Sequence, residues 1–246
     1  MFCIRIAELV IDIDNRYGYV EELCRDYIVH DGKPLFRVSV SRDELDAYIS
    51  ASGRCIPLDE AESHLIYRRI CGRLPMYGAF VFHAAAVLQG ERAYAFSAAR
   101  GVGKTTHAKL WQEVFNGNGL VPRAEIINGD KPILRAIEGR LWIWGTPWSG
   151  KERIQKNTAK PLCAICFLEQ GRENIIEPCR TADTIARILE STEYPDTQEG
   201  VDALARLVAK TVKSVPAFTL KCRPDEEAVR VAWLELSHAE EGLFEI

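Results

Sequence analysis

One ten-residue segment constrains the fold of this chain more than any other. Residues 97–106 are Ser-Ala-Ala-Arg-Gly-Val-Gly-Lys-Thr-Thr, which matches the phosphate-binding pattern G-x-x-x-x-G-K-[ST] except that Ala98 replaces the first glycine. An alternating strand pattern ends at Ser97, and an amphipathic helical pattern begins at Lys104. The segment therefore predicts a strand, a tight loop and a helix in that order, which is the context that a phosphate-binding loop requires. The alternative is a chance glycine-rich turn.

Each residue type in this segment has a physical task. Gly101 and Gly103 permit positive φ, so that successive backbone N–H groups can point at phosphate oxygens. The positive end of the following helix favours the same anion. Lys104 is expected to reach the β- and γ-phosphates, and the Thr105 hydroxyl to bind Mg²⁺. We therefore predict that the chain binds ATP and Mg²⁺, with the nucleotide held by Ala98, Ala99, Arg100, Gly101, Val102, Gly103, Lys104, Thr105 and Thr106.

Three residues outside the loop are candidate partners. Asp130 follows a short apolar strand pattern and is the predicted second metal ligand, although Asn-Gly-Asp-Lys-Pro also makes turns on its own. His83 lies on an apolar strand expected to pair with the strand before the loop; a hydrogen-bonded core histidine is the alternative. Lys151 ends the segment 144–151, which is rich in turn formers, and could instead be a solvated lysine. Arg153 and Lys156 add positive charge nearby.

Composition excludes some functions. The 246 residues carry a formal net charge of −4 and give a pI of about 5.8, so no broad basic field is available for a nucleic acid. No apolar stretch approaches the roughly 20 residues that span a bilayer. The alternating pattern of Met1–Asp14 is that of a strand and not of a secretory signal. We therefore predict a soluble cytoplasmic protein without a nucleic-acid or membrane partner.

The eight cysteines do not form a compact framework. Cys163 and Cys166 form a C-x-x-C within an apolar strand pattern. An offset of three on a strand places two side chains on opposite faces, which disfavours a metal or redox site. We expect both thiols to be packed in the core.

Two regions are expected, in a mixed α/β fold. Residues 1–75 form a small N-terminal α+β section, with strands at Phe2–Ile13, Tyr19–Val29 and Leu35–Val40, a short helix capped by Ser41 and Glu44, and a helix at Leu58–Leu74. Residues 76–246 form the nucleotide-binding catalytic core, with mixed and largely antiparallel sheets. Its expected strands are 79–88, 93–97, 125–128, 133–137, 140–144, 161–169, 175–178 and 217–221. Its expected helices are 104–115, 181–190, 199–213 and 225–236, and a loop covers 116–119.

Taken together, these residues resemble the HPr kinase/phosphorylase family and the related ATP-dependent phosphoenolpyruvate carboxykinases, over roughly residues 75–235. Phe82-His83-Ala84 is similar to the family's histidine-bearing strand, and Gly-Lys-Thr-Thr at 103–106 looks like the carboxykinase loop. The segment 144–151 resembles a loop of small HPr-kinase-like proteins, some of which phosphorylate a serine of a precursor peptide. The resemblance implies an HPr-kinase-like P-loop core and a possible homo-oligomer.

One departure concerns the catalytic base. The family has an aspartate pair, and Gly129 stands where the first of the two is implicated as the base. His83 or Asp130 would have to replace it.

The predicted activity is that of an ATP-dependent kinase that transfers the γ-phosphoryl group to a hydroxyl, with a serine of a peptide or small protein as the expected acceptor. The predicted catalytic residues are His83, Lys104, Asp130 and Lys151, with residues 1–75 recognising the acceptor. A kinase acting on a small metabolite is one alternative, and it would show a closed pocket in place of an exposed groove. A nucleotide-binding module without catalysis is the other, and Gly129 is the feature that favours it.

Overall fold

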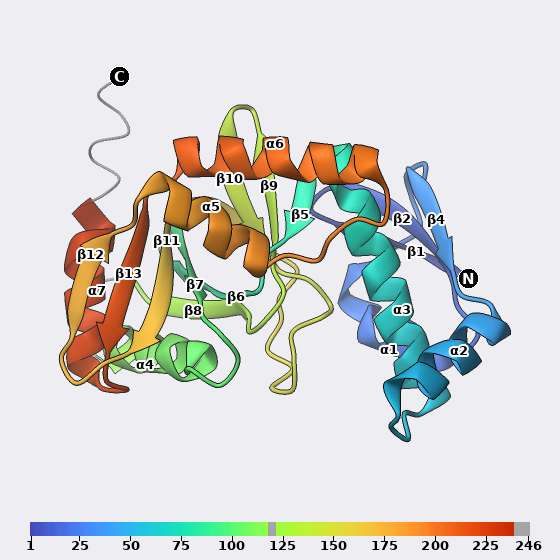
Figure 1. Ribbon diagram of the computed structural model, residues 1–246, viewed down its shortest axis with the longest axis horizontal. Helices are drawn as coiled ribbons and strands as arrows, with labels where there is room; N and C mark the ends of the chain where they lie inside the picture. Colours follow the sequence, from blue (N-terminus) through green and yellow to red (C-terminus); the bar gives the residue numbers. More distant parts are fainter. Residues whose placement is uncertain (118–121, 239–246) are drawn as a thin grey trace.

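The computed structural model describes residues 1–117 and 122–238. Two sheets organise the chain (Figure 1). The smaller sheet has four strands in the order β3-β1-β2-β4, and the larger one has nine strands. Positions 118 and 119 of the loop expected at 116–119 lie outside the described residues, and the prediction is wrong at 116 and 117, which still belong to the helix that begins at Lys104.

The first predicted strand, Phe2–Ile13, is wrong in one respect because it is a hairpin. β1 (Phe2–Ile6) and β2 (Leu9–Asp14) pair antiparallel. Ala7 and Glu8 turn the chain with φ of 47° and 61°. Two-residue hairpin turns of this kind usually contain Asn or Gly, and the absence of those residues hides the turn.

The second predicted strand, Tyr19–Val29, is wrong because most of it is helical. The segment folds as α1 (Gly18–Leu23), a 3-10 turn η1 (Arg25–Tyr27) and a short strand β3 (Ile28–Val29). Its buried positions Val20, Cys24 and Tyr27 are four and three residues apart. That spacing places them on one face of a helix, whereas a half-buried strand would bury alternate residues.

The rest of the front section follows the prediction. β4 (Phe36–Ser39) pairs parallel with β2, and α2 (Arg42–Ser52) begins at the predicted capping box. In that box the Glu44 N–H donates to Ser41 Oγ at 3.3 Å, and the Ser41 N–H donates to Glu44 Oε2 at 2.8 Å. α3 (Leu58–Arg73) runs over nearly the predicted residues.

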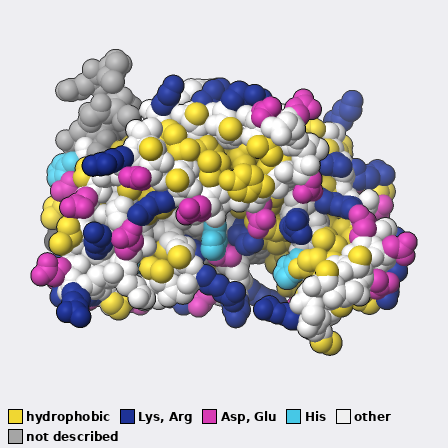
Figure 2. Space-filling model, viewed as in Figure 1, with side chains coloured by type: hydrophobic (Ala, Val, Ile, Leu, Met, Phe, Trp, Pro, Cys, Tyr) yellow, Lys and Arg dark blue, Asp and Glu magenta, His cyan; other side chains and the backbone are white. Residues whose placement is uncertain are grey.

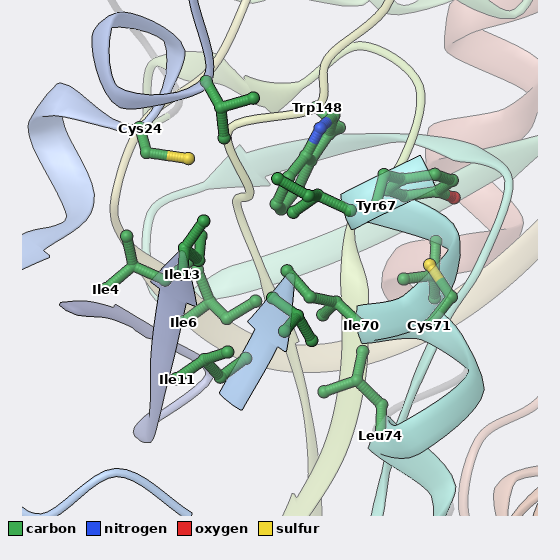
Figure 3. Close-up of a cluster of buried hydrophobic side chains, with 14 of the residues drawn as sticks. Ile4, Ile6, Ile11, Ile13, Cys24, Tyr67, Ile70, Cys71, Leu74 and Trp148 are labelled. Carbon is green, nitrogen blue, oxygen red and sulfur yellow. The ribbon is translucent and has the colours of Figure 1, made fainter. Parts of the chain in front are cut away.

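One hydrophobic cluster joins the front section to the core (Figure 3). It contains isoleucines of β1 and β2, apolar side chains of α3, and residues from beyond position 76. The last group comprises Ala79, Val81, Ile133 and Trp148. The apolar packing therefore runs across the boundary between residues 75 and 76. The division of the chain into two domains at this boundary stays a prediction.

The larger sheet is mixed and mostly antiparallel, as expected. Its order is β5-β9-β10-β11-β7-β6-β8, with β13 beside β11 and β12 beside β13, and only the β7–β11 and β11–β13 pairs are parallel. The strands are β5 (Ala79–Val81), β6 (Ala84–Gln89), β7 (Arg92–Ser97), β8 (Ala124–Asn128), β9 (Ile133–Ile137), β10 (Arg140–Trp144), β11 (Ala159–Gln170), β12 (Ile175–Pro178) and β13 (Ala217–Cys222). The run predicted as one strand at 79–88 is divided between β5 and β6.

Helices cover both faces of this sheet (Figure 1). Alternate residues of β6 divide between two apolar clusters: Ala84 and Ala86 pack with α5 and α6, and Ala85 packs with α4 and α7. The bounds of the four helices are α4 (Lys104–Gly117), α5 (Thr181–Glu190), α6 (Gln198–Ser214) and α7 (Glu226–His238). None of the helices within the described residues combines the length and hydrophobicity that spanning a bilayer requires.

The C-x-x-C thiols are packed in the core, as predicted, but they do not lie on opposite faces. Cys163 and Cys166 are both buried, and both belong to the cluster beneath α4 and α7. A register shift in the β7–β11 pair between Leu162 and Ala164 is the reason. An irregularity of this kind re-aims a side chain, which simple alternation cannot anticipate.

Candidate functional site

The segment 98–103, here called the glycine loop, connects the end of β7 to the start of α4. The predicted order of strand, loop and helix is therefore confirmed. Gly101 and Gly103 adopt φ of 84° and 121°, a backbone region that glycine enters at little cost and other residues rarely adopt. β7 lies between β6 and β11, so the sheet holds the start of the loop from both sides.

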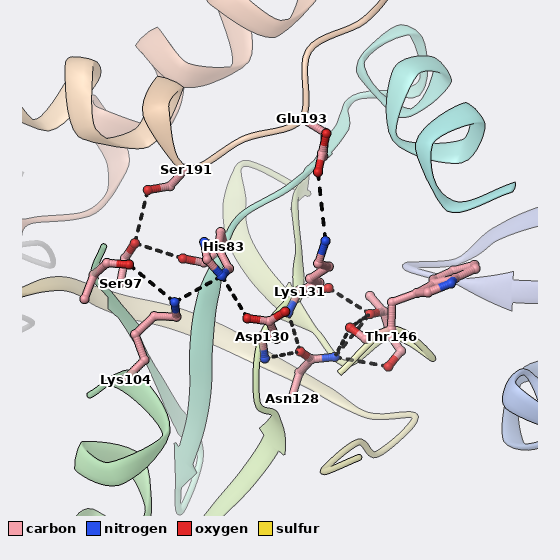
Figure 4. A network of polar contacts seen from close by, with 11 residues as sticks. His83, Ser97, Lys104, Asn128, Asp130, Lys131, Thr146, Ser191 and Glu193 are labelled. Carbon is pink, nitrogen blue, oxygen red and sulfur yellow. Dashed lines mark hydrogen bonds and ion pairs between the residues drawn. The ribbon is translucent and has the colours of Figure 1, made fainter. Parts of the chain in front are cut away.

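Three of the four predicted catalytic side chains meet at this loop (Figure 4). Lys104 Nζ lies 3.0 Å from His83 Nε2 and 3.3 Å from the Ala98 carbonyl oxygen. His83 Nε2 also lies 2.8 Å from Asp130 Oδ1. Side chains that are 47 residues apart in the sequence are thus in direct contact.

The backbone fixes the spacing of this cluster. His83 sits in the break between β5 and β6, where its N–H donates to the Ser191 carbonyl at 2.7 Å. The next residue, Ala84, donates its N–H to the carbonyl of Asp130 at 3.1 Å. Asp130 follows β8, which pairs with β6. The histidine and the aspartate are therefore held on two adjacent, hydrogen-bonded segments.

The charges in the cluster stabilise one another. Burial lowers the pKa of Lys104, which is 8% exposed, and the charge of Asp130 opposes that shift. Burial alone would raise the pKa of Asp130, but the hydrogen bond with His83 and the nearby positive charges of Lys131 and Lys104 hold it below its ordinary value. Asp130 is therefore a carboxylate at neutral pH.

The two contacts of His83 Nε2 compete. A lysine ammonium can only donate a hydrogen bond and a carboxylate can only accept one, whereas Nε2 of a neutral imidazole either donates or accepts. The nitrogen cannot satisfy Lys104 and Asp130 in the same tautomer. One of the two contacts is therefore weak. When Nε2 carries the proton it donates to Asp130, and the Ala98 carbonyl is then the acceptor that remains for the ammonium of Lys104.

A cavity of about 520 Å³, here called the loop cavity, opens in front of this cluster. Arg100 and Lys151 line it, are exposed, and have no carboxylate partner among residues 1–117 and 122–238. Lys151, the fourth predicted catalytic residue, thus shares the cavity with the other three without bonding to them. The full lining is His83, Ala99, Arg100, Gly101, Gly103, Lys104, Thr105, Thr106, Gly129, Asp130, Ser149, Gly150, Lys151 and Glu152.

Two of the predicted nucleotide contacts do not line the loop cavity. Ala98 and Val102 line an adjoining cavity of about 660 Å³, which shares His83, Ala99 and Arg100 with the loop cavity and also contacts Phe167 and Arg187. The other residues predicted to hold the nucleotide all line the loop cavity; they are Ala99, Arg100, Gly101, Gly103, Lys104, Thr105 and Thr106. The structure therefore brings most of the predicted set, but not all of it, to one place.

The predicted metal ligands, Thr105 and Asp130, line the same cavity. The described part of the chain contains no cluster of three or more His, Cys, Asp and Glu side chains that could hold an ion by itself. This donor set suits Mg²⁺, which is usually bound by one or two protein oxygens together with phosphate oxygens and waters. It does not suit a metal that needs a complete set of protein ligands.

Asn128 is a positioning residue that the sequence patterns did not single out. Its side chain is fully buried, and its Oδ1 accepts the N–H groups of Asp130 at 2.9 Å and Lys131 at 2.6 Å. Its Nδ2 donates to the Thr146 carbonyl at 3.0 Å and to Thr146 Oγ1 at 3.1 Å. One amide therefore holds both the turn that carries Asp130 and the segment that leads to Lys151 (Figure 4). An asparagine at the end of a strand was the available signal, but its burial could not be predicted.

The structure explains why position 129 is unsuited to a carboxylate. A Cβ at Gly129 would lie 3.2 Å from the Ser149 carbonyl oxygen and 3.9 Å from Ile154 Cβ. A side chain there would press on the backbone of the 149–154 segment. The family-type base at this position would also add a second negative charge beside Asp130.

We predict that Gly129→Asp lowers the free energy of unfolding by about 1–2 kcal/mol, because of this crowding, and does not increase ATP turnover. Chemical denaturation measures the first effect and an ADP-release assay the second. Gly18→Asp is the control, since a Cβ at Gly18 meets nothing within 4 Å and an acid suits the start of α1. A gain in turnover for Gly129→Asp would show that position 129 can supply a base.

The comparisons with known proteins give little beyond this geometry. The chain matches no family model and no curated protein sequence. Among solved structures, the HPr(Ser) kinase/phosphatase from Coxiella burnetii superposes on 64% of this chain and 98% of its own, with 11% sequence identity and a TM-score of 0.37. This is a distant structural similarity. The functional conclusion therefore rests on the residues of the site itself.

Proposed function

We propose that the chain is an ATP- and Mg²⁺-dependent phosphotransferase that acts on a hydroxyl group. One observation carries the proposal: Lys104, His83 and Asp130 form a chain of contacts beside a glycine loop whose two glycines have positive φ. A loop of this shape at a helix N-terminus presents backbone N–H groups to phosphate. Lys104 adds a charge that can move onto the phosphates, and Asp130 adds an ionised carboxylate.

A second cavity provides room for the nucleoside. It has a volume of about 470 Å³ and shares Gly101, Gly103 and Thr106 with the loop cavity. Val102 and Pro224 contribute apolar surface to it. A nucleotide lying across the loop would place its base in this second cavity and its terminal phosphate in the loop cavity, toward Asp130.

Mg²⁺ would be held by Thr105 and Asp130, where it would neutralise charge on the phosphates. The hydroxyl oxygen of the acceptor attacks the γ-phosphorus, and the bond from that phosphorus to the β–γ bridging oxygen breaks, so that ADP leaves. Lys104, Arg100 and Lys151 would face the charge that spreads over the γ-phosphoryl oxygens. His83 would accept the proton of the hydroxyl, because Asp130 is occupied by the metal.

Nucleotide binding without catalysis is the second candidate function. Gly129 favours it, because the position at which the resembled family has its base carries no side chain. His83 opposes it, because an imidazole already in contact with Asp130 can serve as a base.

Removal of the metal tests the proposal. We expect the full-length protein to form ADP from ATP only with Mg²⁺, and faster when a hydroxyl acceptor is present, with serine peptides and small hydroxyl metabolites assayed separately. EDTA should abolish turnover and excess Mg²⁺ should restore it. ATP binding without turnover with either class of acceptor would support the non-catalytic module. A protein that binds no ATP at all would contradict the proposal.

A further inference from the structure

A groove of about 440 Å³, here called the front groove, separates α1 and α3 from the segment 147–153. Figure 2 shows the molecule hollowed between the front section and the core, with Lys and Arg side chains beside the opening. Its lining includes Tyr67, Lys131, Trp148, Lys151 and Arg153.

The front groove and the loop cavity meet at Asp130. Both are lined by Asp130, Ser149, Gly150 and Lys151. Two of these shared residues, Gly150 and Asp130, lie close together, because a Cβ placed on Gly150 would be only 3.0 Å from Asp130 Cβ. A group that lies in the groove can therefore reach the end of the loop cavity at which the terminal phosphate would lie.

Polar contacts hold the walls of the groove in place. The Glu62 carboxylate of α3 is fully buried and accepts the N–H groups of Arg16 at 2.6 Å and Tyr17 at 3.0 Å, just before α1. At the other end of α1, Asn157 Nδ2 donates to the Asp26 carbonyl at 2.9 Å. The first two bonds fix α1 against α3 within the front section, and the third ties the front section to the core, so the groove exists before any ligand binds.

The groove has an aromatic part and a cationic part. The rings of Tyr67 and Trp148 lie 5.5 Å apart between centroids, and Lys131 Nζ lies 4.2 Å from the Tyr67 ring centroid. Lys151 and Arg153 are exposed and have no carboxylate partner among the described residues. The two rings are almost completely buried, at 5% and 9% exposed, and form the floor of the groove. A ligand that suits this surface carries a negative charge for the two cations.

We propose that the front groove binds the polypeptide segment around the hydroxyl that is phosphorylated, and that Arg153 selects an acidic residue next to that hydroxyl. This inference rests on the proposed phosphotransferase function. An open groove with separate aromatic and charged parts fits an extended peptide. A small metabolite would instead require convergent charges in a closed pocket. Arg153 is the residue to change, because it lines the groove but not the loop cavity.

A serine-centred peptide library with randomised flanking positions tests the proposal in two assays. One assay measures retention of peptides on the immobilised full-length protein, and the other measures phosphate incorporation with ATP and Mg²⁺. Wild-type protein should enrich Asp and Glu beside the serine about fivefold, as expected for an exposed ion pair. Arg153→Glu should abolish that enrichment or shift it to Lys and Arg. Arg153 has a positive φ, and glutamate tolerates such a backbone conformation in this protein, because Glu8 and Glu138 also have positive φ.

Arg68→Glu is the matched control, because Arg68 is an exposed arginine of α3 outside the groove lining. It should keep the wild-type preference. The groove proposal fails if wild-type protein shows no acidic preference, if Arg153→Glu retains it, or if only small hydroxyl compounds are phosphorylated. Retention with acidic preference but without phosphate incorporation would support the groove and contradict the kinase. Phosphate incorporation without acidic preference would support the kinase and contradict the groove proposal.

Discussion

Lys104→Ala is expected to lower the rate of ATP turnover at least about a thousandfold and to weaken ATP binding. The substitution removes the buried cation that follows the glycine loop, and cations that stabilise a transferring phosphoryl group contribute factors of this size. Folding should be nearly unaffected, because the ammonium of Lys104 is buried at a cost that its contacts offset only in part. ADP release and chemical denaturation measure the two effects.

Lys156→Ala is a suitable control for this prediction. Lys156 is exposed, pairs with Glu125, and lines neither the loop cavity nor the second cavity. It should retain wild-type turnover. If Lys104→Ala kept its turnover within about tenfold of the wild type, the loop cavity would not be the phosphate site.

The parts of this structure that could be predicted from sequence depend on local chemistry. The capping box of Ser41 and Glu44 is complete within four residues, and it forms as predicted. The same holds for the glycine loop, because the strand pattern, the two glycines and the amphipathic helix are contiguous. In both cases the interacting groups are close in the chain, so their meeting does not depend on the rest of the fold.

The predictions that failed concern segments whose structure depends on distant contacts. The residue types of Tyr19–Val29 predict a strand, but the segment begins as a helix whose N-terminal end is fixed by the carboxylate of Glu62, 45 residues from Tyr17. Likewise, His83 and Lys151 could be named as candidates but not placed. The pairing of β6 with β8 brings His83 to Asp130, and the buried amide of Asn128 helps to place the segment that leads to Lys151.

Asn128→Ala is expected to lower the free energy of unfolding by about 3 kcal/mol or more. It leaves the N–H groups of Asp130 and Lys131 without their acceptor in a half-buried turn, and a donor that is removed from water without a partner costs about 1–3 kcal/mol. The variant that folds should also turn over ATP about a hundredfold more slowly, because a carboxylate displaced by about 1 Å loses much of its effect. Chemical denaturation and ADP release at a temperature where the variant is folded measure both changes.

Asn157→Ala provides the comparison, since Asn157 is exposed and its side chain donates to the Asp26 carbonyl. This substitution should lower the free energy of unfolding by less than about 1 kcal/mol. A double-mutant cycle of Asn128→Ala with Thr146→Val measures whether the two side chains stabilise the fold as one network. They are in contact, because Thr146 Oγ1 accepts from Asn128 and donates to the Lys131 carbonyl at 2.7 Å. The two losses should not be additive, as is usual for residues of one buried network. Additive losses would mean that the turn of Asp130 and the 146–151 segment are held independently, so that Asn128 would not link Asp130 to the front groove.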